Sequence, residues 1–528
     1  MMINQVDIKY IVIKKNRMST NWTPKKNNQI LRSLRKFQAT FLILSFALSL
    51  LVQPTQAEDV VWPQFRGPGG NALALGQSIP NEFGPDKNVI WKTALPSGHS
   101  SPVIWGNKIF LSGHVGTTVK MICLSRTDGK ILWEQKRKIL KVPQFYHING
   151  SVAASSAATD GEQVCFYFDD YGLVTTDLNG DLLWEHKFAI STSNLFSYGA
   201  SPIIDAGKVL LNRDGAIDSC LICFDIKTGK EVWKAKRPNA INSYCSPYIL
   251  KTKTGKEVLQ GGSGELVAYD SQTGKEVWKA TGLTGFVCPS PVADKDTIYF
   301  GGWTTAHVSG RNLISSAFPK EANLSSEALV DVKAFYKQFD LDKDGSISKI
   351  EFPESRLKDV FTMTDQNKND LIDMEELDFW YKAKPLNGRN IFYAIKTGGK
   401  GDITKTHVKW EVKRGLPYVC SPLVQDDKLY LVKKGGFVSC INTKTGKPFY
   451  KSERLGLGGE YYATPISVGN KILIAAQRGT VFLIKPSEEF EILASNKIGE
   501  NISATPAIID NTIYLRGEKH LWAFRESK

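Results

Sequence analysis

A twelve-residue stretch in the second half of the chain, 340–351, places acidic side chains at the spacing that a hard cation requires. A calcium ion takes about six to eight oxygen ligands, and a carboxylate at every second residue directs several oxygens inward from one tight turn. Gly345, at the sixth position, gives the backbone the freedom that such a turn needs. The stretch therefore predicts a calcium loop. Its candidate ligands are Asp340, Asp342, Asp344, the carbonyl oxygen of Ser346 and Glu351.

A second stretch, 365–376, keeps the pattern with fewer charges. Position six is Asp370 instead of Gly, and because Asp tolerates left-handed backbone better than most residues, we expect a strained but allowed loop. At positions one, three, five and twelve the first loop has four carboxylates and the second has two, so we expect tighter binding at the first. Alternatively, the second loop serves only as a packing partner for the first. Its candidate ligands are Asp365, Asn367, Asn369, the carbonyl oxygen of Leu371 and Glu376.

The segment that carries both loops, 315–385, is acidic, helical in its apolar spacing and poor in strand signals. The first loop fits the EF-hand pattern at every position, and the two loops together predict an inserted EF-hand pair with short intervening helices. Ile347 and Ile372, each at position eight, are expected to pair as a short bridge between the loops.

The rest of the chain repeats a unit of about 44 residues with four short apolar runs bounded by turn residues. Four strands per repeat indicate one propeller blade. Units open at a Ser or Thr that is followed by Pro in all cases but one, and many close with a Gly turn and a Trp. The eight openings are Ser101, Ser156, Ser201, Ser246, Ser290, Ser421, Thr464 and Thr505.

The sequence thus predicts an all-β, eight-bladed propeller of four-stranded blades with a small α-helical insertion in blade five. The last unit has only three strands, and the isolated strand 88–95 is expected to complete it and close the ring. The alternative is an open stack of sheets. The expected domains are an irregular segment 58–87, the propeller over 88–314 and 386–528, and the insertion 315–385. The insertion follows the second strand of its blade, so it should lie on the face where the units open.

Residues 1–57 predict a targeting segment, with basic residues over 25–36, an apolar run over 39–52 and cleavage after Ala57. We therefore expect a periplasmic or extracellular protein with no membrane span after cleavage; an uncleaved anchor is the alternative. Cleavage would leave 58 of the 67 Lys and Arg against 52 of the 53 acidic residues. No basic stripe interleaved with aromatic residues is present, so nucleic-acid binding is not expected.

The repeated Gly-Lys-x-x-Trp turn and the Ser-Pro openings resemble the pyrroloquinoline-quinone-like (PQQ-like) propeller repeats. These are shared by quinoprotein dehydrogenases and by the non-enzymatic barrel-assembly lipoprotein of Gram-negative outer membranes. The segment WPQFRGP, 62–68, is similar to the start of exported Planctomycetes-type propeller proteins. The resemblance implies the fold more than the function, because the Gly forms a hairpin turn and the Trp docks one blade on the next.

Three functions are compatible with these observations. We expect a calcium-binding scaffold or binding protein that is not an enzyme, whose partner, a protein or a carbohydrate, occupies the face bearing the insertion. The first alternative is a quinone-dependent oxidoreductase. That family clamps PQQ with adjacent cysteines and holds calcium within the propeller, whereas no two cysteines are adjacent here, so PQQ is not expected. No catalytic residues are assigned, and residues that would bind an organic cofactor are unknown.

The second alternative is a carbohydrate-binding propeller. Six aromatic residues shortly precede the unit openings and could ring the channel mouth as a stacking surface, or simply pack between blades. They are Tyr198, Tyr244, Phe286, Tyr418, Tyr461 and Tyr462.

The eight cysteines allow two interpretations. Cys245, Cys288 and Cys420 occupy nearly equivalent positions in three blades, where they either form one disulfide or are small buried residues. Cys220 and Cys223 lie three apart in a predicted strand, so they should face opposite sides and share no metal.

Overall fold

The structure is a computed structural model that describes residues 61–139, 150–188, 199–215, 219–238, 240, 243–285, 287–304, 318, 322–355, 360–365, 367–382 and 388–526. The predicted targeting segment lies outside these residues. None of the described helices is long and apolar enough to cross a membrane.

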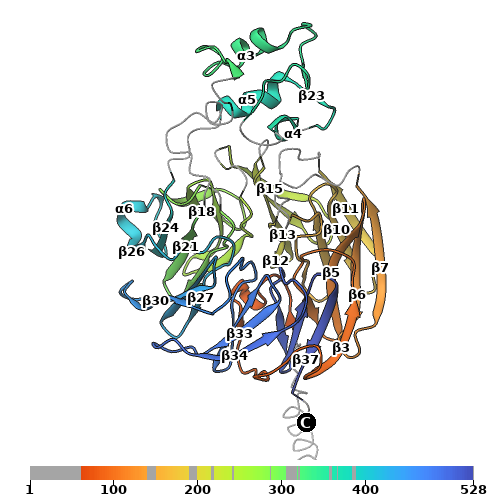
Figure 1. Cartoon of the computed structure of the whole chain (residues 1–528), viewed down its shortest axis with the longest axis vertical. Helices are drawn as coiled ribbons and strands as arrows, with labels where there is room; N and C mark the ends of the chain where they lie inside the picture. The colour runs from red at the N-terminus through yellow and green to blue at the C-terminus, as the bar shows by residue number, and fades with distance from the viewer. Residues whose placement is uncertain are drawn as a thin grey trace, which may run out of the picture. The chain divides into compact units, whose positions relative to one another are not determined.

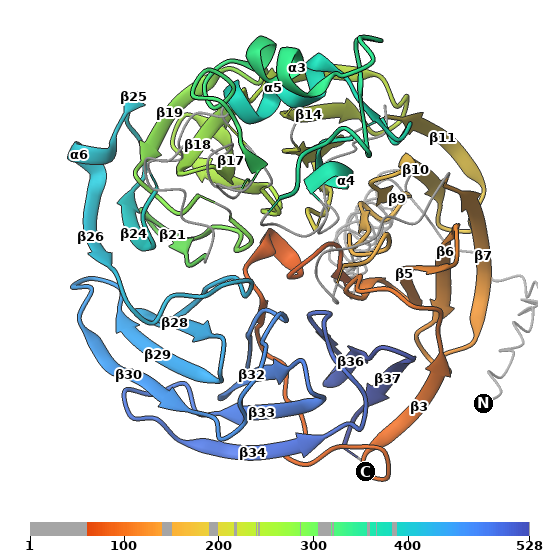
Figure 2. The ribbon, with the colours of Figure 1, turned by 45° about the horizontal axis from the view of Figure 1, so that its top comes forward.

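Eight antiparallel sheets form a ring, and the eight-bladed propeller is confirmed (Figures 1 and 2). Blade one consists of β4 (Val103–Trp105), β5 (Lys108–Val115), β6 (Thr118–Ser125) and β7 (Ile131–Lys138). Blade two consists of β8 (Ala158–Thr159), β9 (Gln163–Phe168), β10 (Gly172–Asp177) and β11 (Leu182–Lys187). Blade three consists of β12 (Ile203–Asp205), β13 (Lys208–Arg213), β14 (Cys220–Asp225) and β15 (Glu231–Lys236). Blade four consists of β16 (Tyr248–Thr252), β17 (Gly255–Gly262), β18 (Glu265–Asp270) and β19 (Glu276–Thr281).

In blades five to eight, as in blades one to four, the strands are named in order from the innermost, at the channel, to the outermost. Blade five consists of β20 (Val292–Asp294), β21 (Thr297–Gly302), β24 (Ile391–Lys396) and β26 (Val408–Val412). Blade six consists of β27 (Leu423–Gln425), β28 (Lys428–Lys433), β29 (Phe437–Asn442) and β30 (Pro448–Arg454). Blade seven consists of β31 (Ile466–Val468), β32 (Lys471–Ala476), β33 (Thr480–Ile484) and β34 (Ile492–Lys497). Blade eight consists of β35 (Ala507–Ile509), β36 (Thr512–Arg516), β37 (His520–Phe524) and β3 (Val89–Ala94).

The strand β3 closes the ring, as the sequence predicts. It pairs antiparallel with β37, with Lys92 opposite Trp522, and becomes the outer strand of the last blade. The alternative of an open stack is wrong. A closed ring leaves no blade without neighbours on both faces, so the apolar faces of all the sheets are covered.

A circle of hydrogen bonds joins the eight unit openings. In each blade the backbone N–H of the opening Ser or Thr donates to the side-chain hydroxyl of the equivalent residue in the next blade, over 2.8 to 3.4 Å. The last of them runs from Thr505 to the hydroxyl of Ser101 and completes the circle. Ser156, which Ala follows instead of Pro, takes part equally, because the bonds use only its own N–H and hydroxyl.

The Gly turns and Trp residues dock neighbouring blades, as the repeat pattern implies. A Cβ on Gly180 of blade two would lie 2.7 Å from the ring of Trp133 of blade one, so only glycine lets the indole approach. The Trp133 Nε1–H donates to the Leu178 carbonyl at 3.1 Å, and Trp91, Trp184, Trp233 and Trp410 make equivalent bonds to the next blade. Trp278 differs, because its Nε1–H donates to Glu257 of its own blade.

Three blades gain a fifth short strand, a difference from the predicted four. In blade four, β25 (Gly401–Asp402) pairs in parallel with the outer strand β19. It belongs to the long connection between β24 and β26, which also contains α6 (Thr404–His407). In blades one and seven the added strands, β1 (Val61–Trp62) and β2 (Leu73–Ala74), lie along the inner strands.

Strands β1 and β2 belong to residues 61–75, which we call the channel segment. This segment crosses the ring and includes the 3-10 turn η1 (Pro68–Gly70). Its Arg66 guanidinium donates to the Ser290 and Pro291 carbonyls of blade five. The Pro63 carbonyl accepts from blade two, and Asn71 accepts from Tyr248 of blade four. The segment therefore ties the inner strands of five blades together, and Figure 2 shows it near the centre of the ring.

The insertion lies between β21 and β24, the second and third strands of blade five. It contains α3 (Val332–Phe339), β22 (Ile347–Ser348), α4 (Val360–Thr364), β23 (Leu371–Ile372) and α5 (Met374–Lys382), which Figure 1 shows together on one side of the ring. In a four-stranded meander this connection emerges on the face where the innermost strand of each blade begins, which we call the entrance face.

The hydrogen-bonded circle predicts the effect of removing one hydroxyl. Ser246→Ala leaves the buried N–H of Ser201 without its acceptor. It should therefore reduce the free energy of unfolding by about 1–3 kcal/mol, measured from the midpoint of guanidinium unfolding. Thr254→Ala, in an exposed hairpin of the same blade, should change the unfolding free energy by less than about 0.5 kcal/mol. Equal effects of the two substitutions would contradict a structural role for the circle.

Candidate metal centre

The first predicted loop begins where helix α3 ends. Asp331 caps the N-terminus of α3 by accepting the Lys333 N–H at 3.1 Å, and Asp340 follows the last helical residue. Phe335 and Tyr336 on its inner face are buried in the core of the insertion together with Ile347 and Ile372. The helix thus fixes the direction in which the loop leaves.

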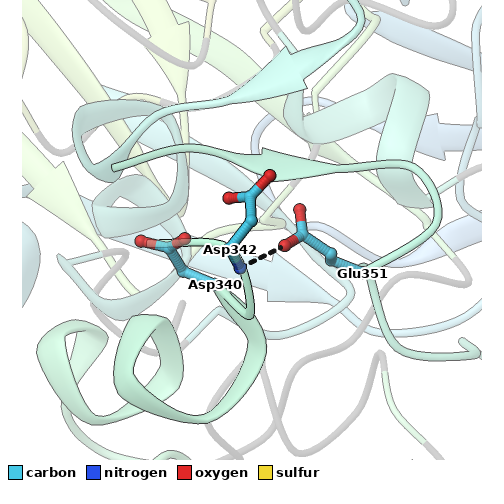
Figure 3. A group of neighbouring side chains, drawn as sticks. All are labelled: Asp340, Asp342 and Glu351. Atoms are coloured by element: carbon cyan, nitrogen blue, oxygen red, sulfur yellow. Dashed lines mark hydrogen bonds between the residues drawn. The ribbon is translucent and has the colours of Figure 1, made fainter. Parts of the chain in front are cut away.

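Three predicted ligands of the first loop converge. One carboxylate oxygen from each of Asp340, Asp342 and Glu351 lies within 4.8 Å of the others (Figure 3). The Oδ1 atom of Asp340 is buried and has no hydrogen-bond partner among the described residues. Buried oxygens are almost always bonded, so an unpartnered carboxylate oxygen beside two other carboxylates fits a cation-binding position.

Glu351 is held in place by donors from the loop. Its Oε1 accepts the N–H groups of Leu341 and Asp342, and its Oε2 accepts the N–H and the hydroxyl of Ser348. Hydrogen bonds from Ser348 are the main cause that lowers the pKa of Glu351 to about 2. The side chain is therefore ionised and oriented at neutral pH. Asp344 is not part of the converging group; its Oδ1 accepts the N–H of Ser346.

The second loop repeats the hydrogen bonds of the first, position by position. The N–H of residue six donates to the carboxylate of residue one in both loops, from Gly345 at 3.2 Å and from Asp370 at 3.0 Å. Four further backbone N–H groups donate to the same side-chain position in both loops. The N–H groups of positions three and nine donate to the side chain of position twelve, that of position five donates to position three, and that of position seven donates to position five. The backbone at position six is left-handed in both, with φ of 87° at Gly345 and 62° at Asp370. Asp370 therefore adopts the strained conformation that the sequence suggested.

The two loops lie side by side. Strands β22 and β23 pair antiparallel, with Ile347 opposite Ile372, which is the pairing expected from position eight of each loop. The loops differ in their surroundings, because Asp365 and Glu376 are buried whereas Asp342 is exposed. Burial raises the pKa of Asp365, so the charged form of this carboxyl is less favourable without a cation.

The second loop also contacts the propeller. The Lys368 Nζ lies 3.3 Å from the Asp170 Oδ1 in the turn between β9 and β10 of blade two, on the entrance face. Asp169 beside it is buried, and burial raises its pKa well above its usual range, with the charge of Asp170 raising it further. Lys368 therefore supplies a positive charge to two adjacent buried carboxyl groups. Sequence reasoning missed this contact, because the partners are 198 positions apart and neither belongs to a motif.

The predicted aromatic ring is only partly described, because Tyr198 and Phe286 lie outside the described residues. Tyr461 is buried and donates its hydroxyl to the Leu457 carbonyl at 2.8 Å, so it is a packing residue. Tyr418 meets Trp303 edge to face at a centroid distance of 5.8 Å, and burial raises its pKa to about 12. Tyr244 and Tyr462 are half-buried. The structure therefore favours packing for Tyr461 and Tyr418.

Cys245, Cys288 and Cys420 are free thiols, so no disulfide joins any two of them. Burial raises the pKa of Cys288 and Cys420 to about 12, as expected for small core residues. Cys220 packs toward blade two and Cys223 toward blade four, so they face opposite sides of β14 as predicted.

The channel segment lies near the centre of the ring (Figure 2), so any ligand on the ring axis would have to share this space with it. The channel segment crosses the axis and pairs with the inner strands there, and Trp62 and Arg66 are buried. Arg66 is the cation best placed to receive a carboxylate, but it donates to two backbone carbonyls of blade five. Burial lowers its pKa to about 10. The arrangement supports a structural role for Arg66.

Comparisons with known proteins agree on the fold. The family model described as outer membrane protein assembly factor BamB matches residues 84–247 and 218–310. The chain is similar to the crystal structure of BamB from Moraxella catarrhalis, with 14% identity, TM-score 0.51, and coverage of 83% of this chain and 99% of that one. It is also similar to the quinohemoprotein alcohol dehydrogenase from Comamonas testosteroni, with 11% identity, TM-score 0.50, and coverage of 89% and 81%. No curated protein matches the sequence significantly.

These comparisons establish the fold, a PQQ-like β-propeller. Because the sequence identities are low, the comparisons say nothing of the activity. The resemblance of the repeats to the PQQ-like type is therefore confirmed.

The ion pair between loop and propeller predicts a local effect. Lys368→Ala should reduce the free energy of local opening by about 1–3 kcal/mol, because Asp170 is buried and loses its cation. Hydrogen exchange of the turn 169–171 and of residues 367–371 would measure this. Lys343→Ala is the matched control, since Lys343 occupies the same position in the first loop and forms no ion pair with a described residue. Equal exchange in both variants would show that the ion pair does not hold the insertion.

Proposed function

We propose that the chain is an exported, calcium-binding β-propeller that acts as a scaffold or binding protein. The observation that carries this proposal is the converging group of Asp340, Asp342 and Glu351, with an unpartnered buried oxygen on Asp340. Oxygen ligands of this kind suit a hard cation such as calcium. The proposed ligands of the first site are completed by Asp344 and the Ser346 carbonyl, after rotation of the Asp344 side chain toward the ion.

The second loop is proposed as a weaker site, with Asp365, Asn367, Asn369, the Leu371 carbonyl and Glu376 as ligands. The shared hydrogen bonds support the assignment, because both loops have the backbone that directs residues one, three, five and twelve inward. The charge difference supports the ranking, since two carboxylates attract the ion less than four. Calcium is plentiful outside the cytosol, where sites of about 0.1–1 mM affinity are filled.

The scaffold role is supported by the ring and by the family description. The propeller is tied internally by the hydroxyl circle and the channel segment, and the matching family is described as an assembly factor. We propose that a protein or carbohydrate partner binds the entrance face, beside the insertion. Calcium in the second loop would then order the segment that carries Lys368, which contacts Asp170 of blade two. The ion and the partner would therefore bind on the same face of the propeller.

Calcium titration of the chain from residue 58 tests the assignment. Isothermal calorimetry should resolve two sites, and Asp340→Asn should abolish the tighter one. Asp365→Asn should leave the tighter site unchanged and weaken the other. Each substitution removes one ligand charge without changing the side-chain shape, so a structural effect would appear separately in the circular dichroism spectrum. Two equal sites, or a tighter site that survives Asp340→Asn, would refute the ranking.

Relief of backbone strain at Asp370 gives an independent prediction. Asp370→Gly removes the cost of a left-handed conformation, about 0.5–1 kcal/mol, and should tighten the weaker site about two- to fivefold. The affinity of the first site should not change. A weaker second site in this variant would mean that the Asp370 side chain assists the ion.

A further inference from the structure

A groove of about 370 Å³ lies at the junction of blades five and six, outside the insertion that carries the calcium loops. Its walls are the end of outer strand β26 on one side and strands β29 and β30 on the other. Val412 and Ile441 are apolar lining residues, and Ser439 contributes a hydroxyl. Cavities that hold small molecules measure about 300–1,000 Å³ and combine an apolar wall with a few polar groups.

Arg414 lies two residues beyond the end of β26, the outer strand of blade five, and lines the groove. Within β26, side chains alternate between the two faces, so Trp410 and Val412 share the face toward blade six. Trp410 docks on Gly446 of blade six, and Val412 packs against the core between the two blades. Arg414 is exposed and contributes a positive charge to the lining of the groove.

The second cation of the groove is Lys451, which lies beside an extra register shift between β29 and β30 of blade six. Each of the other seven blades has one register shift between its third and outer strands, whereas β29 and β30 have two. The additional shift sets Lys451 and Ser452 opposite the single residue Ser439, and Ser452 has a left-handed φ of 57°. Bulges re-aim side chains and are frequent beside functional sites. Here the bulge places Lys451 in the lining of the groove.

The charges of the groove are unbalanced. Lys413 forms an ion pair with Glu411 at 2.7 Å, which neutralises both. Arg414 and Lys451 form no ion pair with a described residue, so two positive charges from different blades face one hollow. Nearby cations without a counter-ion attract an anion, and a guanidinium can bind an oxyanion through two parallel hydrogen bonds.

We propose that this groove is a binding site for a small organic anion, a molecule of up to about disaccharide size that carries a carboxylate or a phosphate group. Arg414 and Lys451 bind the oxyanion, and Val412 and Ile441 contact its apolar part. The site is independent of the calcium loops and of the partner on the entrance face.

Direct binding measurements test the proposal with two probes, digalacturonate as a dicarboxylate and glucose 6-phosphate as a phosphate ester. Ligand-observed NMR titration should show saturable binding of at least one probe, and the preferred probe identifies the oxyanion. Arg414→Gln with Lys451→Gln should weaken that binding about tenfold or more. Lys234→Gln with Lys236→Gln, two exposed cations on the outer strand of blade three, is the matched control for net charge and should have no effect.

Two outcomes would overturn the proposal. One is that neither probe, at concentrations up to 10 mM, shows saturable binding to the folded protein. A dissociation constant of 10 mM corresponds to a binding free energy of about 3 kcal/mol. The other is equal binding by the groove variant and the control variant, which would show that the anion senses only overall charge. Because both pairs of residues are exposed, unfolding does not account for a loss of binding, and the thermal midpoint of each variant checks this.

Discussion

The structure depends on a circle of eight hydrogen bonds in which the backbone of each blade donates to a hydroxyl of the next. These groups are buried at the channel edge, where an unpaired N–H would be costly. Because each blade is both donor and acceptor, the circle is complete only when the last blade meets the first. Strand β3 makes that possible by supplying the missing outer strand of blade eight. The channel segment then joins five inner strands from within.

The insertion builds on this support. Its two loops share five backbone-to-side-chain hydrogen bonds and differ in charge and exposure. Because the acceptors are the proposed ligand side chains, these bonds orient the ligands of both loops in the same way. The second, more buried loop contacts the propeller through Lys368. We propose that the loop with more carboxylates is the tighter calcium site, while the other loop connects the insertion to the ring. We infer that this division suits a scaffold whose binding face is ordered by an ion.

The fold could be predicted from local patterns. Ser-Pro openings, Gly-Lys turns and Trp residues recur at fixed offsets. The openings correspond to a hydrogen bond made at all eight blade junctions, and the Trp residues to a bond made at five. The number of blades and the closure by residues 88–95 therefore follow from the sequence. The spacing from Asp340 to Glu351 likewise locates the first candidate site. The path of residues 61–75 could not be derived, because Pro and Gly indicate irregular backbone but not its partners. The contact of Lys368 with Asp170 and the second bulge at Ser452 depend on tertiary packing, which no local pattern encodes.

Anomalous scattering from crystals of residues 58–528, soaked with a lanthanide ion of calcium's size, would locate the cations bound to the protein. We expect the strongest peak among Asp340, Asp342 and Glu351, a weaker peak at Asp365 and Glu376, and a ring closed by β3 against β37. No peak at the first loop, or a dominant peak within the propeller channel, would contradict this expectation.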